Sequence, residues 1–102
     1  MSTLNQNSRL MMPEWVIICT ARYALGRMTY IVSCACDLLR ETWPLLSEET
    51  KNILKRDIEA EFERAARMGR SPGIGHPLGM KCDVEEWEKV RLLWQSEEVT
   101  IR

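Results

Sequence analysis

Two tyrosines and an arginine in the first third of the chain have the spacing of one helical face. Tyr23, Arg27 and Tyr30 are four and then three residues apart, and Gly26 lies among them. On an α-helix this spacing places both phenols and the guanidinium on one stripe. A guanidinium binds phosphate or carboxylate through paired hydrogen bonds, and a tyrosine ring stacks on a base. Together with Arg22, the stripe is a candidate surface for binding a flat or anionic molecule.

The same stripe also fits a buried seam between two helices. In that alternative Arg27 pairs with an acidic residue, because a buried guanidinium without a partner is very costly. The acceptors that we consider for it are Asp37, Asp57 and Asp83. The sequence leaves open whether these residues belong to a binding site or to the core.

A second candidate region is the segment 70–81, which contains three glycines and two prolines and is therefore predicted to be a loop. Arg70, His76 and Lys81 would give this loop donors for an anion, as a flexible flap over a ligand. In the competing interpretation the glycines only allow turns, and His76 is a surface residue. The GxG pattern at 73–75 is neither a P-loop nor a dinucleotide fingerprint, because no Lys-Ser/Thr pair and no helix follows it directly.

No set of residues predicts catalysis or metal binding. The single histidine has no recognisable nucleophile or second metal ligand beside it in the sequence. The four cysteines include no CxxC pair, and free cysteines are commonly small buried residues. We therefore predict no enzyme activity, no cofactor and no metal, and we expect a reducing cytoplasm.

Composition bounds the size of the protein and the classes of its partners. With 102 residues, 45% of them hydrophobic, the chain is expected to fold as one domain with a packed core. The net charge of −1 argues against a general nucleic-acid binder. The apolar run 15–21 ends at Arg22 and is too short to span a membrane. So many large apolar residues in a short chain favour self-association, and we expect a homo-oligomer.

The elements that position these residues are predicted to be helices. We expect residues 1–12 to be a flexible leader and residues 13–102 to form a single helical domain. The apolar periodicity predicts helices over residues 14–25, 28–43 and 48–68, and a last helix from Asp83 onward. Within the first of these, 15–20 also suits a strand, and the tail 99–102 is either a short strand or an irregular end. The fold class is therefore all-α, a small bundle of three to four helices.

Local signals mark where these helices begin and end. Ser47 is the expected N-cap of the helix 48–68, and Gly69 is its expected C-terminal glycine. Asp83 and Glu86 form a capping box that predicts the start of the last helix at Asp83. The two long helices are expected to be antiparallel across the short turn that begins at Pro44.

Four segments resemble a small protein family that is widespread in tailed phages. They are Arg22-Tyr23-Ala24-Leu25-Gly26-Arg27-Met28-Thr29-Tyr30, Trp43-Pro44-x-Leu46-Ser47, Arg56-Asp57-Ile58 and Leu78-Gly79-x-x-Cys82-Asp83-x-x-x-Trp87, which together span about 65 residues. Small phage accessory proteins often act against host immunity, either by sequestering a nucleotide signal or by blocking a CRISPR effector. The resemblance implies a non-catalytic anti-defence protein in the cytoplasm of the bacterial host.

Two functional hypotheses follow. The leading one is capture of a cyclic or phosphorylated nucleotide at a subunit interface, where arginines hold phosphate, tyrosines stack and the loop closes. The candidate ligand-binding residues are Arg22, Tyr23, Arg27, Tyr30, Arg70 and His76. The alternative is an anti-CRISPR-like inhibitor that binds a host defence protein through an acidic helix face and an exposed tryptophan.

Overall fold

The computed structural model describes residues 13–27 and 29–101, and within them every regular element is helical. The expected leader, residues 1–12, lies outside the described residues. The elements are the α-helices α2 (Glu14–Ala24), α3 (Thr29–Thr42), α4 (Glu48–Met68) and α5 (Lys81–Ile101), with a short 3₁₀ helix, η1 (Trp43–Leu45), before α4. The prediction of a small all-α bundle is confirmed, and the segment 15–20 is helix rather than strand.

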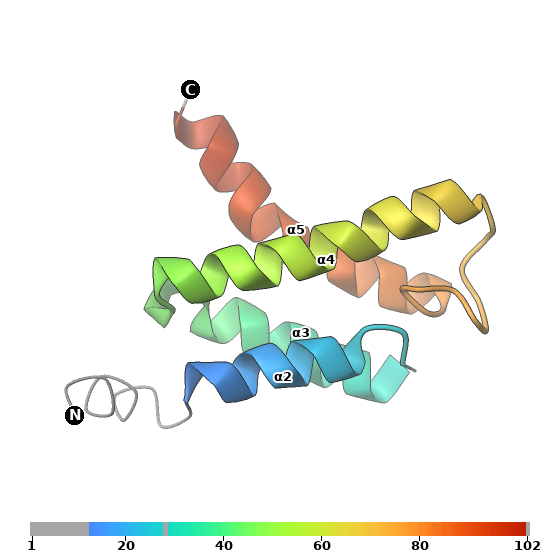
Figure 1. Cartoon of the computed structure of the whole chain (residues 1–102), viewed down its shortest axis with the longest axis horizontal. Coiled ribbons are helices and arrows are strands. Elements are labelled where there is room, and N and C mark those ends of the chain that lie inside the picture. The colour runs from blue at the N-terminus through green and yellow to red at the C-terminus, as the bar shows by residue number, and fades with distance from the viewer. Residues whose placement is uncertain (1–12, 28, 102) are drawn as a thin grey trace.

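The helices form two layers, with α2 and α4 nearer the viewer in Figure 1 and α3 and α5 behind them. Both α3 and α4 pack against α2 and against α5. The chain direction reverses between α3 and α4, as predicted (Figure 1). However, these two helices contact each other less than either contacts α2 or α5, so they do not form a closely packed pair.

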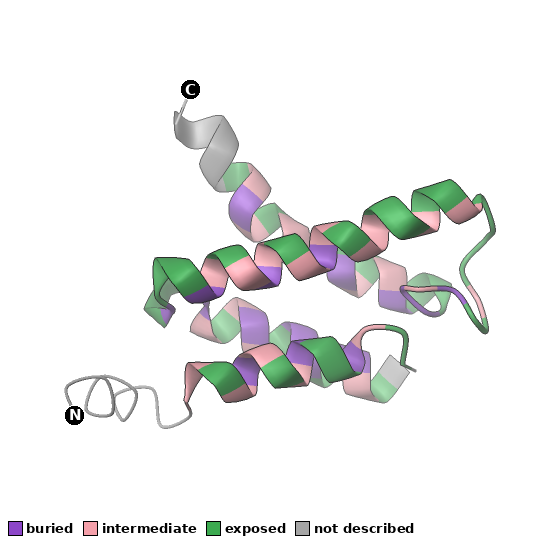
Figure 2. Cartoon of the chain, in the orientation of Figure 1, coloured by how far each residue is buried: buried purple, intermediate pink, exposed green. Residues whose placement is uncertain are grey.

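The core lies between the layers, where each helix contributes one apolar stripe (Figure 2). On α2 the stripe is Ile17, Ala21 and Ala24, and each of these residues is at most 2% exposed. The rings of Trp43 and Trp94 meet with their centroids 5.4 Å apart, which connects η1 to α5. Trp87 is fully buried and Trp94 is 3% exposed, so both tryptophans of α5 belong to the core. Each large apolar side chain buried here contributes about 1.5–3 kcal/mol to stability.

The two ends of α4 follow the local signals in the sequence. The Ser47 hydroxyl accepts the backbone N–H of Thr50 at 3.3 Å, which satisfies a free donor of the first turn. The carboxylate of Glu14 on α2 accepts hydrogen bonds from the side chains of both Ser47 and Thr50, so the cap also joins the beginnings of two helices. At the other end Gly69 adopts the left-handed conformation, with φ 66°.

The start of α5 differs from the prediction. The helix begins at Lys81, and Asp83 is its third residue rather than its cap. The buried Asp83 carboxylate reaches back and accepts the N–H of Met80 at 2.8 Å, which is the role of the acidic residue in a capping box. Of the two alternatives for the tail 99–102, the short strand is wrong where the structure describes the tail, because α5 continues to Ile101.

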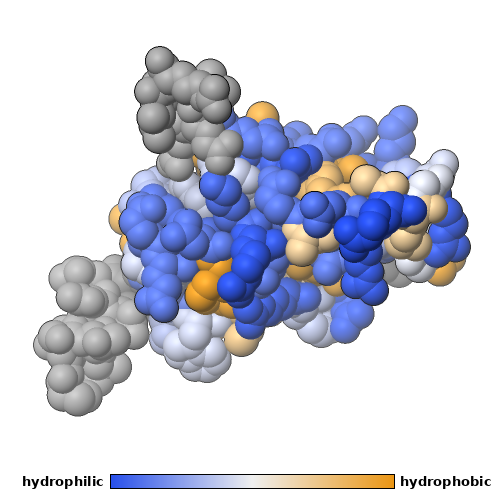
Figure 3. Space-filling view, turned by 45° about the horizontal axis from the view of Figure 1, so that its top comes forward, coloured by the Kyte–Doolittle hydropathy of each residue, from blue (hydrophilic) through white to orange (hydrophobic). Residues whose placement is uncertain are grey.

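Hydrophilic side chains cover most of the face seen in Figure 3, with smaller apolar areas between them. On α4 several charged side chains form ion pairs along the helix, such as Arg67 with Glu63 at 3.7 Å. This is the solvated helix face that the alternating charges of the sequence indicate. Within the described part of the chain, no helix has the length and apolar character needed to cross a lipid bilayer.

Candidate functional site

The predicted tyrosine and arginine stripe does not lie on a single helix. The helix α2 ends at Ala24, and Gly26 turns the chain with φ 81°, a conformation that favours glycine. Tyr23 therefore belongs to α2, Arg27 to the turn and Tyr30 to α3. Only part of the stripe survives: the Arg27 guanidinium lies over the Tyr23 ring, 4.7 Å from its centroid.

The alternative of a buried seam is wrong for these residues. Tyr23 is 56% exposed and Tyr30 is 81% exposed, and Arg27 is exposed as well. The three aspartates considered as partners of Arg27 have other roles. Asp37 pairs with Arg40, Asp57 pairs with Arg22, and Asp83 caps α5.

The loop between α4 and α5 is fixed to the core at its second half, which differs from a flexible flap. Leu78 is 1% exposed, and the backbone of Gly79 bonds back to that of Gly73 at 2.9 Å. His76 is only 8% exposed, so the prediction of a surface histidine is wrong. Its Nδ1 accepts the N–H of Leu78 at 3.1 Å, and in the neutral ring Nε2 therefore carries the proton.

Gly79 allows this loop to pack closely against the turn between α2 and α3, and the turn contacts the loop at Gly26 at an ordinary van der Waals distance. A Cβ atom on Gly79 would lie 3.0 Å from the carbonyl oxygen of Arg27 and 2.6 Å from a carboxylate oxygen of Asp83. A Cβ atom on Gly26 would lie 3.5 Å from the carbonyl oxygen of Pro77. The close approach of the two backbones brings the loop beside the end of α2.

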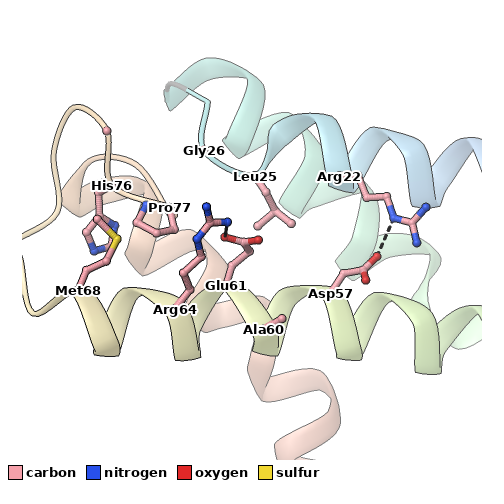
Figure 4. A pocket seen from close by; sticks show the side chains of 11 residues that line it. Arg22, Leu25, Gly26, Asp57, Ala60, Glu61, Arg64, Met68, His76 and Pro77 are labelled. Carbon is pink, nitrogen blue, oxygen red and sulfur yellow. Dashed lines mark hydrogen bonds and ion pairs between the residues drawn. The ribbon is translucent and has the colours of Figure 1, made fainter.

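This arrangement leaves an open groove of about 580 Å³ between α2, α4 and the loop (Figure 4). Its apolar walls come from the turn after α2, from α4 and from the loop, namely Leu25, Ala60, Met68 and Pro77. At one end Arg22 Nε donates to Asp57 Oδ2 at 2.7 Å. Arg64 extends from α4 in the middle of the groove, between Pro77 and Glu61, and His76 and Met68 lie at the other end (Figure 4).

The groove contains two of the six predicted ligand-binding residues. Arg22 and His76 line it, whereas Tyr23, Arg27 and Tyr30 do not. Arg27 lines a separate hollow of about 120 Å³ under the glycine-rich loop. Arg70 is exposed and lines none of the described hollows.

Sequence reasoning missed Arg64, which is the most accessible cation of the groove. Its side chain is 63% exposed, and Glu61 Oε1 lies 3.7 Å from Nη1. In the sequence Arg64 is one of many charges on α4, and its spacing from Glu61 indicates only an ion pair. Nothing local distinguishes it, because its place in the groove depends on the packing of α2 and the loop against α4.

The sequence suggested that the cysteines are buried, but only Cys36 is buried in the structure. Cys36 is fully buried, and burial raises the pKa of its thiol to about 12, so it remains a protonated core residue. Cys19, Cys34 and Cys82 are exposed and form no disulfide. Among the residues that the structure describes, no three His, Cys, Asp or Glu side chains are grouped to hold a metal ion.

Comparison of the chain with protein-family models, curated proteins and solved structures finds no match. The resemblance to a phage family therefore stays a prediction from the motifs.

Proposed function

We propose that this chain is a non-catalytic binding protein that captures a small phosphorylated nucleotide in the groove between α2, α4 and the loop. The observation that carries the proposal is the placement of Arg22, Arg64 and His76 around one apolar-walled groove. The volume of about 580 Å³ lies within the range of small-ligand sites.

The cations of the groove retain hydrogen-bond donors for a phosphate. The Arg64 contact to Glu61 at 3.7 Å is longer than a strong charge-assisted hydrogen bond, so its guanidinium is available. Arg22 contacts Asp57 through Nε, and its terminal nitrogens point away from Leu25 and Arg64 in Figure 4, so they reach a ligand in the groove after the side chain rotates. In the neutral His76 ring, Nε2–H adds a donor that the backbone contact at Nδ1 orients.

The two carboxylates of the groove favour a nucleotide over a simple anion. Asp57 and Glu61 partly neutralise the arginines, which weakens attraction for a bare phosphate ion. They also accept hydrogen bonds, and a nucleotide brings ribose hydroxyls and, in several bases, amino groups as donors. A ligand with phosphate at one end and hydroxyl or amino donors at the other satisfies both kinds of lining residue.

The biological role in this proposal is sequestration of a nucleotide immune signal during phage infection, in the bacterial cytoplasm. The sequence motifs support this role. A sequestering protein needs tight binding and no catalytic residues, which agrees with a sequence in which no set of residues predicts catalysis.

Native mass spectrometry of the purified chain tests the proposal, with a cyclic dinucleotide, a cyclic trinucleotide, ADP-ribose, ATP and inorganic phosphate as probes. We expect a stoichiometric adduct with a nucleotide and none with phosphate alone. Arg64→Ala should weaken binding at least roughly tenfold, the typical loss for a charged hydrogen bond to a ligand.

Arg67→Ala is the matched control, because Arg67 lies one turn along the same helix, is 68% exposed and does not line the groove. It should bind as the wild type does. No adduct with any nucleotide, or an equal loss in both variants, would contradict the proposal.

One observation favours the alternative of a protein inhibitor. Trp15 is 65% exposed on α2, and an exposed tryptophan is a frequent anchor at protein interfaces. If the inhibitor hypothesis holds, the chain should capture a host defence protein from infected-cell lysate. Trp15→Ala should abolish this capture, and Arg64→Ala should leave it unchanged.

A further inference from the structure

The outward sides of α2 and α3 carry several exposed side chains without charge, and Asp37 is the charged residue that lies among them on α3, where it pairs with Arg40. We define the α2–α3 face as Cys19, Tyr23, Tyr30, Ile31, Cys34 and Leu38. The four-residue spacing from Cys19 to Tyr23 and from Tyr30 to Cys34 places each pair on one side of its helix, and all four are exposed. Ile31 and Leu38 are only partly buried. Aromatic and apolar side chains therefore remain in contact with water here.

The other two long helices do not share this property. Their exposed sides carry many charged residues, which are Glu48, Glu49, Arg56, Glu63, Arg64 and Arg67 on α4 and Lys81, Glu85, Glu88 and Lys89 on α5. By contrast, the sequence has no charged residue from Trp15 to Ala21 or from Met28 to Cys36. Interface centres are depleted in charge and enriched in tyrosine, so the α2–α3 face has the composition of a contact surface.

Opposite charges lie at the two ends of this face. Arg27 is exposed at the turn end, and Glu41 is exposed at the other end of α3. Glu41 follows Cys34 by seven residues, so it continues the outward row of Tyr30 and Cys34. Asp37 lies between Cys34 and Glu41 on this row, and its charge is offset by the ion pair with Arg40. Eleven residues separate Tyr30 from Glu41, which corresponds to roughly 16 Å along the helix.

We infer that the α2–α3 face binds a second copy of this chain around a two-fold axis. Both copies then use the same surface. A residue at one end of the face in one copy meets the residue at the opposite end of the face in the other copy. Antiparallel docking of two α2–α3 faces brings Arg27 of each copy to Glu41 of the other. It also covers the tyrosines. Charge complementarity at both ends thus identifies the occupant as the chain itself.

This inference goes beyond the proposed function and does not depend on it. The groove lies on the α4 side of α2, where Arg22 pairs with Asp57, and not on the side toward α3. A dimer through the α2–α3 face therefore leaves the groove open.

Analytical ultracentrifugation of the full chain over a range of concentrations tests the dimer. The wild type should shift with concentration from its monomer mass of 11.9 kDa toward twice that mass. Tyr30→Glu places two like charges in the interface and should raise the dissociation constant at least roughly tenfold. Since Tyr30 is 81% exposed, this variant should fold normally.

Leu92→Glu is the control, because Leu92 is 56% exposed on α5, away from the α2–α3 face. It should dimerise as the wild type does. A wild type that is monomeric at every concentration, or an equal loss of dimer in both variants, overturns the inference.

A charge exchange tests the antiparallel arrangement. Arg27→Glu and Glu41→Arg should each weaken the dimer several-fold, because each creates two like-charge contacts per dimer. The double variant R27E/E41R should recover most of the wild-type affinity, since both pairs are restored with opposite sign. If the double variant is as weak as the sum of the single variants, the two ends do not meet and the two-fold arrangement is wrong.

Discussion

At the scale of single residues, Glu59 is the side chain whose protonation affects the fold most directly. Its carboxylate accepts two hydrogen bonds from Arg91, at 2.8 and 2.9 Å, and one from Trp94 Nε1 at 2.9 Å. Burial by itself raises the pKa of Glu59, but the donors Arg91 and Trp94 outweigh it and hold the pKa below its ordinary 4.5. A carboxyl with a lowered folded pKa stabilises the protein above its ordinary pKa and loses this contribution as the pH falls through the folded value.

We therefore predict that Glu59→Gln changes the pH dependence of stability. The variant should be less stable than the wild type at about pH 6, and the difference should shrink as the pH falls below 4.5 and through the lowered folded pKa, where the wild-type carboxyl also becomes neutral. Urea unfolding at several pH values measures this difference. Glu63→Gln is the control, because the Glu63 side chain is 76% exposed. A difference in unfolding free energy between Glu59→Gln and the wild type that stays constant with pH would contradict the prediction.

At the scale of elements, the roles of residues that act only within their own helix were predictable from the sequence. The roles of residues that depend on contacts with distant parts of the chain were not. Ser47 and Gly69 satisfy backbone groups of their own helix, so the sequence alone placed both ends of α4 correctly. Asp83 has a local role too, but Met80 precedes the helix without a capping side chain, and the pattern favoured Asp83 itself as the cap. Gly26 ends α2, although its neighbours have helical spacing, because the turn packs against the loop far along the chain.

The packing of loop against turn gives a prediction at this scale. Gly79→Ala should destabilise the protein by about 2 kcal/mol or more, because φ is 92° and the new Cβ would press on Asp83 and on the Arg27 carbonyl. Gly73→Ala in the same loop is the matched control, since nothing lies within 4 Å of its Cβ position and its φ is not positive. Thermal unfolding of both variants measures the effect. A similar small change in both would show that the close contact has little energetic weight.

At the scale of the whole molecule, the fold class followed from periodicity, but the neighbours of each helix did not. Periodicity shows which side of a helix is apolar and says nothing about which helix covers that side. For that reason α3 and α4 were expected to be close neighbours, whereas α2 and α5 contact both of them. The predicted site was divided for the same reason: α2 presents Arg22 toward α4, and Tyr23 lies outside the groove.

This division predicts that ligand binding and self-association are separable. Arg64→Ala should lose nucleotide binding while the protein keeps its dimer mass, and Tyr30→Glu should lose the dimer while keeping nucleotide affinity per chain. The two side chains share no partner and lie on α4 and α3, so the double variant should show both losses without further interaction. Native mass spectrometry reads both properties in one spectrum. If Tyr30→Glu also abolishes nucleotide binding, the ligand contacts both copies, and the site extends across the dimer from the groove to the α2–α3 face.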